Sequence, residues 1–561
     1  MNVFRLLLVV LSCGLTVACA WPGKLLRGYA EGRPIGLDSA VSSIQEAGGD
    51  PKALGVAHFF YDDWGSLNTD HLDRHTVPWK VAATAMVLEA HDERGLPLEL
   101  ATLARVLTEV GFIQPDAILN WAGPPPDLDR PIGLVRGTMS RGFPSVQLEG
   151  ANVGCAACHT GRLYDETGRA TRNAWIGLPN TSLDLEAYVT TLFRGLAHFQ
   201  GQEERFWEAM DTLFGDMSIR ERNTIRNHAL PLLRDRFAED WQGRTSLLPF
   251  INGSAGLTNG VGAIKNLLGM LGEDETATEV AFTSIPDLGG TILRSSLLYD
   301  GTYGLPDRPR FAAMELAQVT SAHLDGLADI TTFFVVPTLG VQPGRARDGY
   351  SGVRYFMDFL KTLRAPPFPG PIDSALAMDG RRIYHQECAD CHGEFSEGLA
   401  DVLLVSFPNR LVPQDSMGSD PRRWELVTEE FAEAVHDTPY GRYLDVATTG
   451  GYVAPPLTAL WATAPYLHNG SVPTLWHMMH PETRPERFMV GGHMLDFERV
   501  GIAGERDEAG VYRYPADYTP WSSPTLYDTG SPGRSRSGHE AKFRSLTEEQ
   551  KTALLEYLKV L

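Results

Sequence analysis

The chain has 561 residues, of which 43% are hydrophobic and 21% charged, as is typical of soluble globular proteins. At roughly 150 residues per domain this length predicts about two to four domains. Lys and Arg number 49 against 70 Asp and Glu, and the net charge of −21 argues against nucleic acid as a partner. The same charge suits either a basic electron-transfer partner or simple solubility.

The first twenty residues are typical of a secretory signal peptide. Arg5 precedes an apolar run over residues 6–11, which is too short to predict a membrane span. Ala18-Cys19-Ala20 places small residues where a signal peptidase cuts, which predicts a mature start at Trp21. We therefore expect a periplasmic or secreted protein with no membrane span after signal removal. A lipoprotein cut before Cys19 is the alternative.

Residues 21–145 contain no motif that identifies a chemistry. Residues 98–110 have apolar side chains at helical spacing, and three prolines at 124–126 prevent a helix from continuing through the next segment. We predict a helical N-terminal extension here. Its histidines are expected to be ordinary surface or core residues; they are His58, His71, His75 and His91.

Two runs share one pattern, Cys155-Ala156-Ala157-Cys158-His159 (the first motif) and Cys388-Ala389-Asp390-Cys391-His392 (the second motif). Two thiols separated by two residues and followed by a histidine are the signature of covalent haem attachment, in which the histidine becomes the proximal iron ligand. A zinc site would need a second cysteine pair for each run, and after residue 20 the chain has no other cysteine. A redox dithiol would not require the histidine. We expect two c-type haems, bound through Cys155, Cys158, Cys388 and Cys391, with His159 and His392 as iron ligands.

The motifs divide the remaining chain into two predicted units. Residues 146–364 are expected to form a first cytochrome c-like haem domain, residues 365–371 a proline-rich linker, and residues 372–561 a second cytochrome c domain. Each unit ends in a similar helical segment, 358–363 and 556–561. Because a few helices suffice to wrap one haem, we predict a mainly α fold with minor sheet.

A longer internal match joins the two units. Pro286-Asp287-Leu288 leads to Leu298-Tyr299-Asp300-Gly301, and Pro455-Pro456-Leu457 leads to Leu467-His468-Asn469-Gly470 at the same spacing. This indicates one module used twice, with Tyr299 opposite His468. Coincidence between short turn sequences is the alternative.

The two motifs, the linker and the run Ala464-Pro465-Tyr466-Leu467-His468-Asn469-Gly470-Ser471 resemble the bacterial dihaem cytochrome c peroxidase superfamily over roughly residues 145–561. Residues 464–475 and Gly538-His539-Glu540 are closer to its branch of dihaem rubber oxygenases. The resemblance implies that the second haem is six-coordinate and transfers electrons, with His468 as its distal ligand. Competing ligands are Met478, Met479 and Met494.

For the first haem, the resemblance implies reaction with peroxide or dioxygen. Tyr299 and Glu315 are the candidate catalytic residues, Tyr299 at the pocket and Glu315 as the acid that moves a proton in classical peroxidases. Tyr299 is equally a core residue with a satisfied hydroxyl group, and for Glu315 a solvated helix glutamate is the preferred interpretation. Arg294 and His323 are further pocket candidates.

The expected function is an exported, peroxidase-like redox enzyme that uses a small-molecule oxidant and an unidentified redox partner. The alternatives are a haem-dependent dioxygenase that cleaves an apolar substrate and a dihaem electron carrier without substrate chemistry. The distal side of the first haem distinguishes them. A glutamate beside an open iron would favour a peroxidase, an apolar pocket an oxygenase, and a permanent histidine or methionine ligand a carrier.

Overall fold

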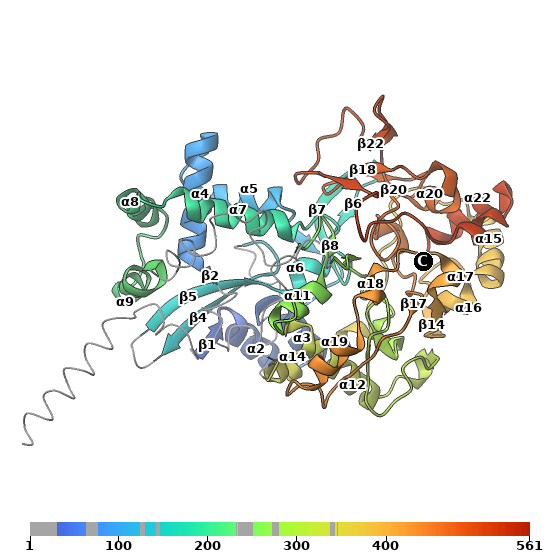
Figure 1. The fold of residues 1–561 in the computed structure, drawn as a ribbon, viewed down its shortest axis with the longest axis horizontal. Coiled ribbons are helices and arrows are strands. Elements are labelled where there is room, and N and C mark those ends of the chain that lie inside the picture. Colours follow the sequence, from blue (N-terminus) through green and yellow to red (C-terminus); the bar gives the residue numbers. More distant parts are fainter. Residues whose placement is uncertain are drawn as a thin grey trace, which may run out of the picture.

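The computed structural model describes residues 31–62, 77–123, 130–141, 146–231, 233, 251–271, 280–336, 343–344 and 346–561 (Figure 1). The predicted signal peptide, His71, His75 and the prolines at 124–126 lie outside the described residues. None of the described helices is long and apolar enough to cross a membrane.

The prediction of a mainly α protein is wrong, because helices alternate with eight small sheets in the described part of the chain. Most strands have only two to four residues, too few to show the alternating pattern that predicts a strand from sequence. Many pair with strands far away in the chain, such as β11 (Tyr303–Gly304) with β16 (Asp445–Val446). Tertiary contacts rather than local pattern therefore specify this sheet content.

Helices and a four-stranded sheet form the end of the molecule at the left of Figure 1, around a separate hydrophobic core. The sheet has the order β1 (Glu31–Pro34), β4 (Leu134–Arg141), β5 (Val146–Val153) and β2 (Val77–Pro78). The helices are α4 (Trp79–Arg94), α5 (Leu100–Glu109), α7 (Leu185–His198), α8 (Glu203–Leu213) and α9 (Ile219–Thr224), followed by the π-helical turn η4 (Ile225–Ala229). The antiparallel β4–β5 hairpin leads directly into α6 (Cys155–Cys158), so it positions the first motif.

A second motif helix is held by close helix packing at the other end of the molecule. α15 (Ser374–Glu387) leads into α16 (Ala389–His392) and packs along the C-terminal helix α22 (Glu548–Leu558). A Cβ on Gly380 would lie 1.9 Å from the carbonyl oxygen of Ala553, so only glycine allows the two backbones to approach this closely. Four residues on, Tyr384 contacts Tyr557 with ring centroids 5.4 Å apart.

A second helix pair repeats this arrangement. α3 (Pro51–Tyr61) packs on α14 (Tyr350–Leu360), and a Cβ on Gly55 would lie 2.4 Å from the backbone nitrogen of Phe356. Phe59, four residues after that glycine, stacks on Phe356 with ring centroids 4.4 Å apart. The partner of α14 thus comes from the segment that the sequence assigned to an N-terminal extension.

The two copies of the internal module share two backbone features, which support the predicted repeat. A short 3-10 helix stands at matching positions, η5 (Thr291–Leu293) and η8 (Leu460–Ala462). Leu298 and Leu467 both adopt positive φ, 71° and 70°, a conformation that few non-glycine residues take.

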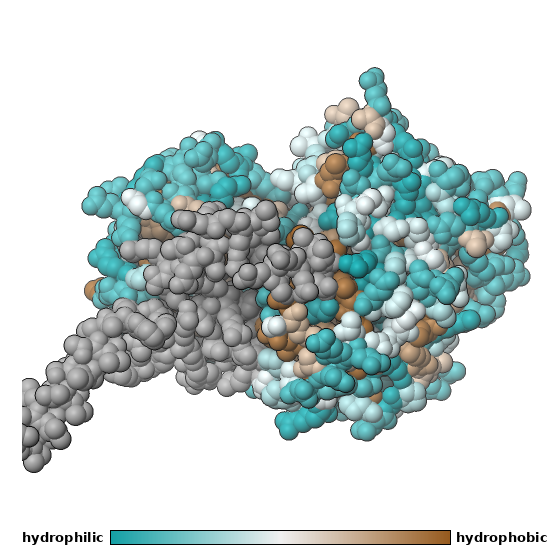
Figure 2. Space-filling model, in the orientation of Figure 1, coloured by the Kyte–Doolittle hydropathy of each residue, from teal (hydrophilic) through white to brown (hydrophobic). Residues whose placement is uncertain are grey.

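The remaining elements connect and cover these parts. The helices are α2 (Leu37–Glu46), α11 (Gly260–Leu267), η6 (Leu316–Gln318), α12 (Ser321–Phe333), η7 (Ala346–Gly349), α17 (Gln414–Met417), α18 (Arg422–Glu425), α19 (Glu429–His436), α20 (Leu475–Met479), η9 (Pro481–Thr483) and α21 (Glu540–Arg544). The strands are β3 (Ala117–Ile118), β6 (Thr160–Tyr164), β7 (Ala170–Ile176), β8 (Leu257–Thr258), β9 (Thr283–Ser284), β10 (Ser296–Leu297), β12 (Met314–Glu315), β13 (Glu394–Phe395), β14 (Leu404–Phe407), β15 (Leu411–Pro413), β17 (Gly451–Val453), β18 (Arg487–Val490), β19 (Leu495–Asp496), β20 (Gly501–Ile502), β21 (Glu505–Arg506), β22 (Val511–Arg513) and β23 (Thr525–Asp528). Figure 2 shows that hydrophilic residues dominate the visible face, as the acidic composition leads one to expect.

Candidate functional site

One cavity of about 1280 Å³ contains both motifs in its lining. Cys155, Cys158 and His159 line it together with Cys388, Cys391 and His392. Ordinary small-molecule pockets measure roughly 300–1,000 Å³, so this cavity exceeds the needs of one such ligand. The structure therefore brings together the six attachment and ligand residues predicted from the two motifs.

The two motif histidines are oriented in the same way by the repeated module. His159 Nδ1 lies 3.2 Å from the Pro286 carbonyl oxygen, and His392 Nδ1 lies 2.8 Å from that of Pro455. Each ring thus donates its Nδ1–H and keeps the Nε2 lone pair for a metal. Pro286 and Pro455 are the first residues of the two module copies, so one task of the repeat is to fix these rings.

Burial keeps both rings in the form that binds a metal. It lowers the pKa of His159 to about 4, although the hydrogen bond to Pro286 acts in the opposite direction. It also lowers the pKa of His392. Both imidazoles are accordingly neutral near pH 7, and Cys388 and Cys391 of the second motif carry free thiols. The donor set and its orientation fit a c-type haem at each motif.

A third histidine, His539, faces His392 across the cavity. Their ring centroids are 6.2 Å apart and their planes differ by 26°, and His539 also lines the cavity. An imidazole nitrogen lies about 2.0–2.1 Å from a bound metal, and the ring centre lies roughly 1 Å further out. Two imidazoles on opposite sides of one iron therefore have centroids roughly 6 Å apart. His392 and His539 have the spacing of an axial ligand pair.

In the sequence, His539 stands out only as part of the family-like ending Gly538-His539-Glu540, and nothing in that pattern predicts a position beside His392. His539 adopts a φ of 67° and precedes α21, so the chain turns at this residue. A non-glycine residue in this conformation deserves inspection as a functional site. Burial, with contributions from His392 and Arg484, lowers its pKa to about 3, which leaves a neutral ring.

His468, the distal ligand implied by the resemblance, lines the same cavity in a different position. Its ring stacks on Tyr452 with centroids 4.2 Å apart and lies 6.3 Å from that of Tyr299. In the described part of the chain no ring contact joins His468 to His392. The geometry favours His539 over His468 as the partner of His392.

Tyr299 lies in the cavity wall with its hydroxyl group already bound. Its oxygen is 2.9 Å from Ser284 Oγ, and burial raises its pKa. Arg294 also lines the cavity and donates to the carbonyl oxygens of Ser296 and Leu298 at 3.0 and 2.7 Å. These contacts match the reading of Tyr299 as a wall residue with a satisfied hydroxyl.

Only some of the other predicted candidates lie in the cavity wall. Glu315 is exposed on β12 and is absent from the lining. His323 is buried elsewhere, with Nε2 3.0 Å from the Ile292 carbonyl oxygen. Met478 and Met479 line the cavity, whereas Met494 does not.

Two buried arginines give the cavity wall a positive character. Burial lowers the pKa of Arg294 to about 10, so it remains protonated at neutral pH. Arg423 pairs with Asp300 at 3.0 Å, and their side chains are 4% and 0% exposed. Guanidinium groups bind carboxylates well, so Arg294 would be a residue to hold a haem propionate, whereas Arg423 is already paired with Asp300.

Two helices contribute apolar side chains to the cavity that contains the first motif. They are α7, with Leu192, Phe193 and Leu196, and α11, with Ala263, Ile264 and Leu267. Among the described residues, no ring faces His159 as His539 faces His392. Within the described residues the two motifs therefore differ in this one contact, because only the second motif has another histidine ring beside its own.

One protein family model matches a short segment that contributes residues to this cavity. Residues 451–489 match the family model for RoxA-like, cytochrome c-like domains. The match covers the second module copy and α20, and it supports a relation to rubber oxygenase-like cytochromes, a c-type haem and a haem-dependent redox function. The relation to the dihaem peroxidase superfamily stays a prediction.

Two curated proteins of Sinorhizobium fredii are similar to parts of the chain. The uncharacterized protein y4iM is 29% identical over 221 residues, which cover 36% of this chain and 48% of y4iM. The uncharacterized protein y4iJ is 25% identical over 293 residues, which cover 41% of this chain and 45% of y4iJ. The chain thus spans about half the length of these relatives.

Asp287, in the cavity wall beside Pro286, is expected to make stability depend on pH. Burial raises its pKa from 3.8 to about 7, even though Thr458 and Gly289 donate hydrogen bonds to it. Between these pH values the folded protein binds a proton that the unfolded chain has released, so the free energy of unfolding falls as pH rises. Asp287→Asn should be more stable than the wild type at about pH 8, by on the order of 2–4 kcal/mol, and the two should converge toward about pH 4.

Thermal or urea unfolding across this pH range measures the effect. Asp517→Asn is the matched control, because the Asp517 side chain is 85% exposed. Equal stability of Asp287→Asn and the wild type at every pH would contradict the prediction.

Proposed function

We propose that the protein is an exported dihaem oxygenase that acts on an apolar substrate at the first haem and passes electrons through a bis-histidine second haem. The observation that carries this proposal is the difference between the motifs. The cavity wall that includes His159 also includes apolar side chains of α7 and α11, whereas the ring of His392 lies 6.2 Å from that of His539. A haem iron with an open axial position binds and activates dioxygen.

The apolar wall around the first motif supports a hydrocarbon-like substrate rather than a polar one. Burying such a substrate against leucine, isoleucine and phenylalanine side chains stabilises the complex by about 25 cal/mol per Å² of apolar surface. The same wall excludes water from the reacting centre. The match of residues 451–489 to RoxA-like, cytochrome c-like domains supports the same assignment.

The peroxidase version has less support. Its proton-moving carboxylate was expected at Glu315, which is exposed and outside the cavity lining. The acidic residues in the lining are Asp287, which Thr458 and Gly289 hold, and Glu387, which pairs with Lys542. Both carboxylates thus already have hydrogen-bond or ion-pair partners, and neither is the glutamate predicted from the peroxidases.

The second motif supports an electron-transfer role. Two histidine ligands close an iron to small molecules and lower its reduction potential relative to a histidine–methionine pair. An electron carrier with two closed irons would need a permanent ligand opposite His159 as well. The redox partner is proposed to be a basic protein, because the chain carries a net charge of −21.

The decisive experiment incubates the purified, haem-loaded protein with a long unsaturated hydrocarbon under heavy-oxygen-labelled dioxygen. We expect shorter carbonyl products that carry the label, detected by mass spectrometry. A parallel assay supplies hydrogen peroxide and a reduced artificial electron donor. Peroxide turnover without labelled products would establish a peroxidase, and inactivity in both assays would favour a carrier.

A further inference from the structure

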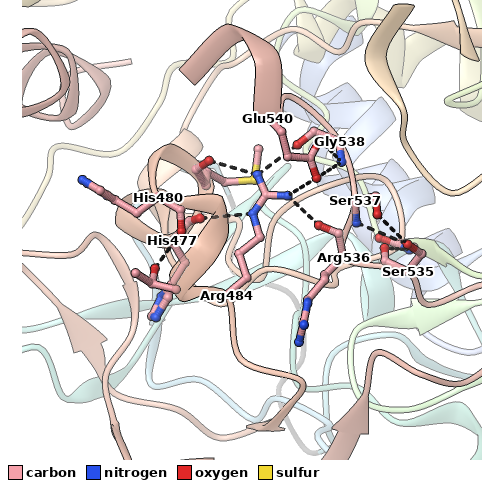
Figure 3. A network of polar contacts seen from close by, with 11 residues as sticks. His477, His480, Arg484, Ser535, Arg536, Ser537, Gly538 and Glu540 are labelled. Atoms are coloured by element: carbon pink, nitrogen blue, oxygen red, sulfur yellow. Dashed lines mark hydrogen bonds and ion pairs between the residues drawn. The ribbon is translucent and has the colours of Figure 1, made fainter. Parts of the chain in front are cut away.

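A buried arginine, Arg484, connects α20 with the loop that contains His539. The Arg484 side chain is 1% exposed and donates hydrogen bonds to five acceptors (Figure 3). These are the carbonyl oxygens of His477 at 3.2 Å, Met478 at 3.0 Å, Arg536 at 2.6 Å and Gly538 at 2.9 Å, and Glu540 Oε1 at 3.1 Å. The N–H groups of this guanidinium thus bind two short segments, residues 477–478 and residues 536–540.

Those two segments carry the candidate ligands of the second haem. Residues 535–540 contain His539, and α20 contains Met478 and Met479, all of which line the cavity. The Nη2 group of Arg484 donates to both Gly538 and Met478, so a single group fixes the distance between the segments. A thioether is the other common axial ligand in c-type cytochromes, which makes the relative position of the segments chemically important.

Glu540 completes the arrangement on the far side of His539. Both of its carboxylate oxygens lie 2.9 Å from the Gly538 backbone nitrogen, and it pairs with Arg484 at 3.1 Å. The residues immediately before and after His539 are therefore held by the same ion pair. The backbone N–H of His539 donates to the Met417 carbonyl oxygen at 3.1 Å, which anchors the turn from a second side. Together these bonds maintain the φ of 67° that directs His539 toward His392.

We propose that Arg484 is a positioning residue that selects His539, rather than a methionine of α20, as the distal ligand of the second haem. This inference rests on the bis-histidine second haem of the proposed function. Arg484 acts through the backbone of the ligand loop and does not touch the iron. Its positive charge is neutralised by Glu540 and by carbonyl oxygens, so the site tolerates its burial.

The test compares Arg484→Met, Arg484→Lys and Arg536→Gln in the haem-loaded full-length protein. Arg484→Met retains volume but removes every donor, and we expect loss of the bis-histidine low-spin signal of the second haem in electron paramagnetic resonance. A high-spin or methionine-ligated signal should replace it, with a positive shift of that haem's reduction potential. Arg484→Lys should restore the native signal in part, because an ammonium group replaces some of the donors.

Arg536→Gln is the matched control on the same loop. The Arg536 side chain reaches Glu486 at 3.3 Å instead of the Arg484 network, so its removal should leave both haem signals unchanged. The first haem is an internal control for folding, since an unfolded chain would lose both native signals. If Arg484→Met proves unstable, Glu540→Gln offers a milder variant that removes the charge but keeps an acceptor, and it should give a smaller shift in the same direction.

A native second-haem signal and potential in both Arg484→Met and Glu540→Gln would overturn the inference. His539→Ala separates this failure from a failure of the ligand assignment. If His539→Ala alters the signal of the second haem and the Arg484 and Glu540 variants do not, then His539 is the ligand and Arg484 does not position it. If His539→Ala changes nothing, the bis-histidine assignment itself is wrong.

Discussion

Replacing His539 with alanine is expected to convert the second haem from low-spin to high-spin iron that binds added small ligands. The physical reason is the 6.2 Å spacing between the His392 and His539 rings, which leaves room for one iron between two imidazoles. Without the second imidazole the iron has an open position. Electron paramagnetic resonance of the oxidised protein, with and without an added ligand such as imidazole, measures the change.

His468→Ala is the informative comparison, because family resemblance alone selects His468. Its ring stacks on Tyr452, so its loss should leave the low-spin signal of the second haem in place. The opposite result, with His468→Ala opening the iron and His539→Ala leaving it closed, would restore the ligand set inferred from sequence.

Removing the thiols of one motif is expected to remove one haem and to affect function differently at each site. Cys155→Ser with Cys158→Ser should leave one covalent haem per chain and reduce hydrocarbon oxygenation by at least about 10³-fold, since the cofactor carries the chemistry. Cys388→Ser with Cys391→Ser should also leave one haem, and should retain dioxygen binding at the first haem while losing electron supply through the second.

The haem content follows from the pyridine haemochrome spectrum and the mass of the intact chain. The wild type should carry two haems, and the combined variant with all four cysteines replaced should carry none. Loss of both haems in each double variant, in chains that remain folded, would show that the motifs form one shared attachment site rather than two.

The local sequence was sufficient to predict a candidate site where all of its residues lie within a few positions of one another. The five-residue motifs contain both thiols and the proximal histidine, and a single helical turn brings them together without help from the rest of the chain. The internal repeat could also be predicted, because corresponding residues occur at one constant spacing. Only the structure shows that the carbonyl oxygens of Pro286 and Pro455 accept hydrogen bonds from the Nδ1 groups of His159 and His392.

Tertiary structure decided the fold class and the choice of His539 as the proposed distal ligand. Strands such as β11 and β16 have two residues each and exist because distant segments pair, so no local pattern predicts them. His392 and His539 are far apart in the chain, and they lie together in a region where α15 packs on α22 and Arg484 binds the loop before α21. By itself, the sequence predicts which residues would bind haem covalently. Which histidine lies beside His392, and which side chains share the cavity with His159, depends on packing between segments that lie far apart in the chain.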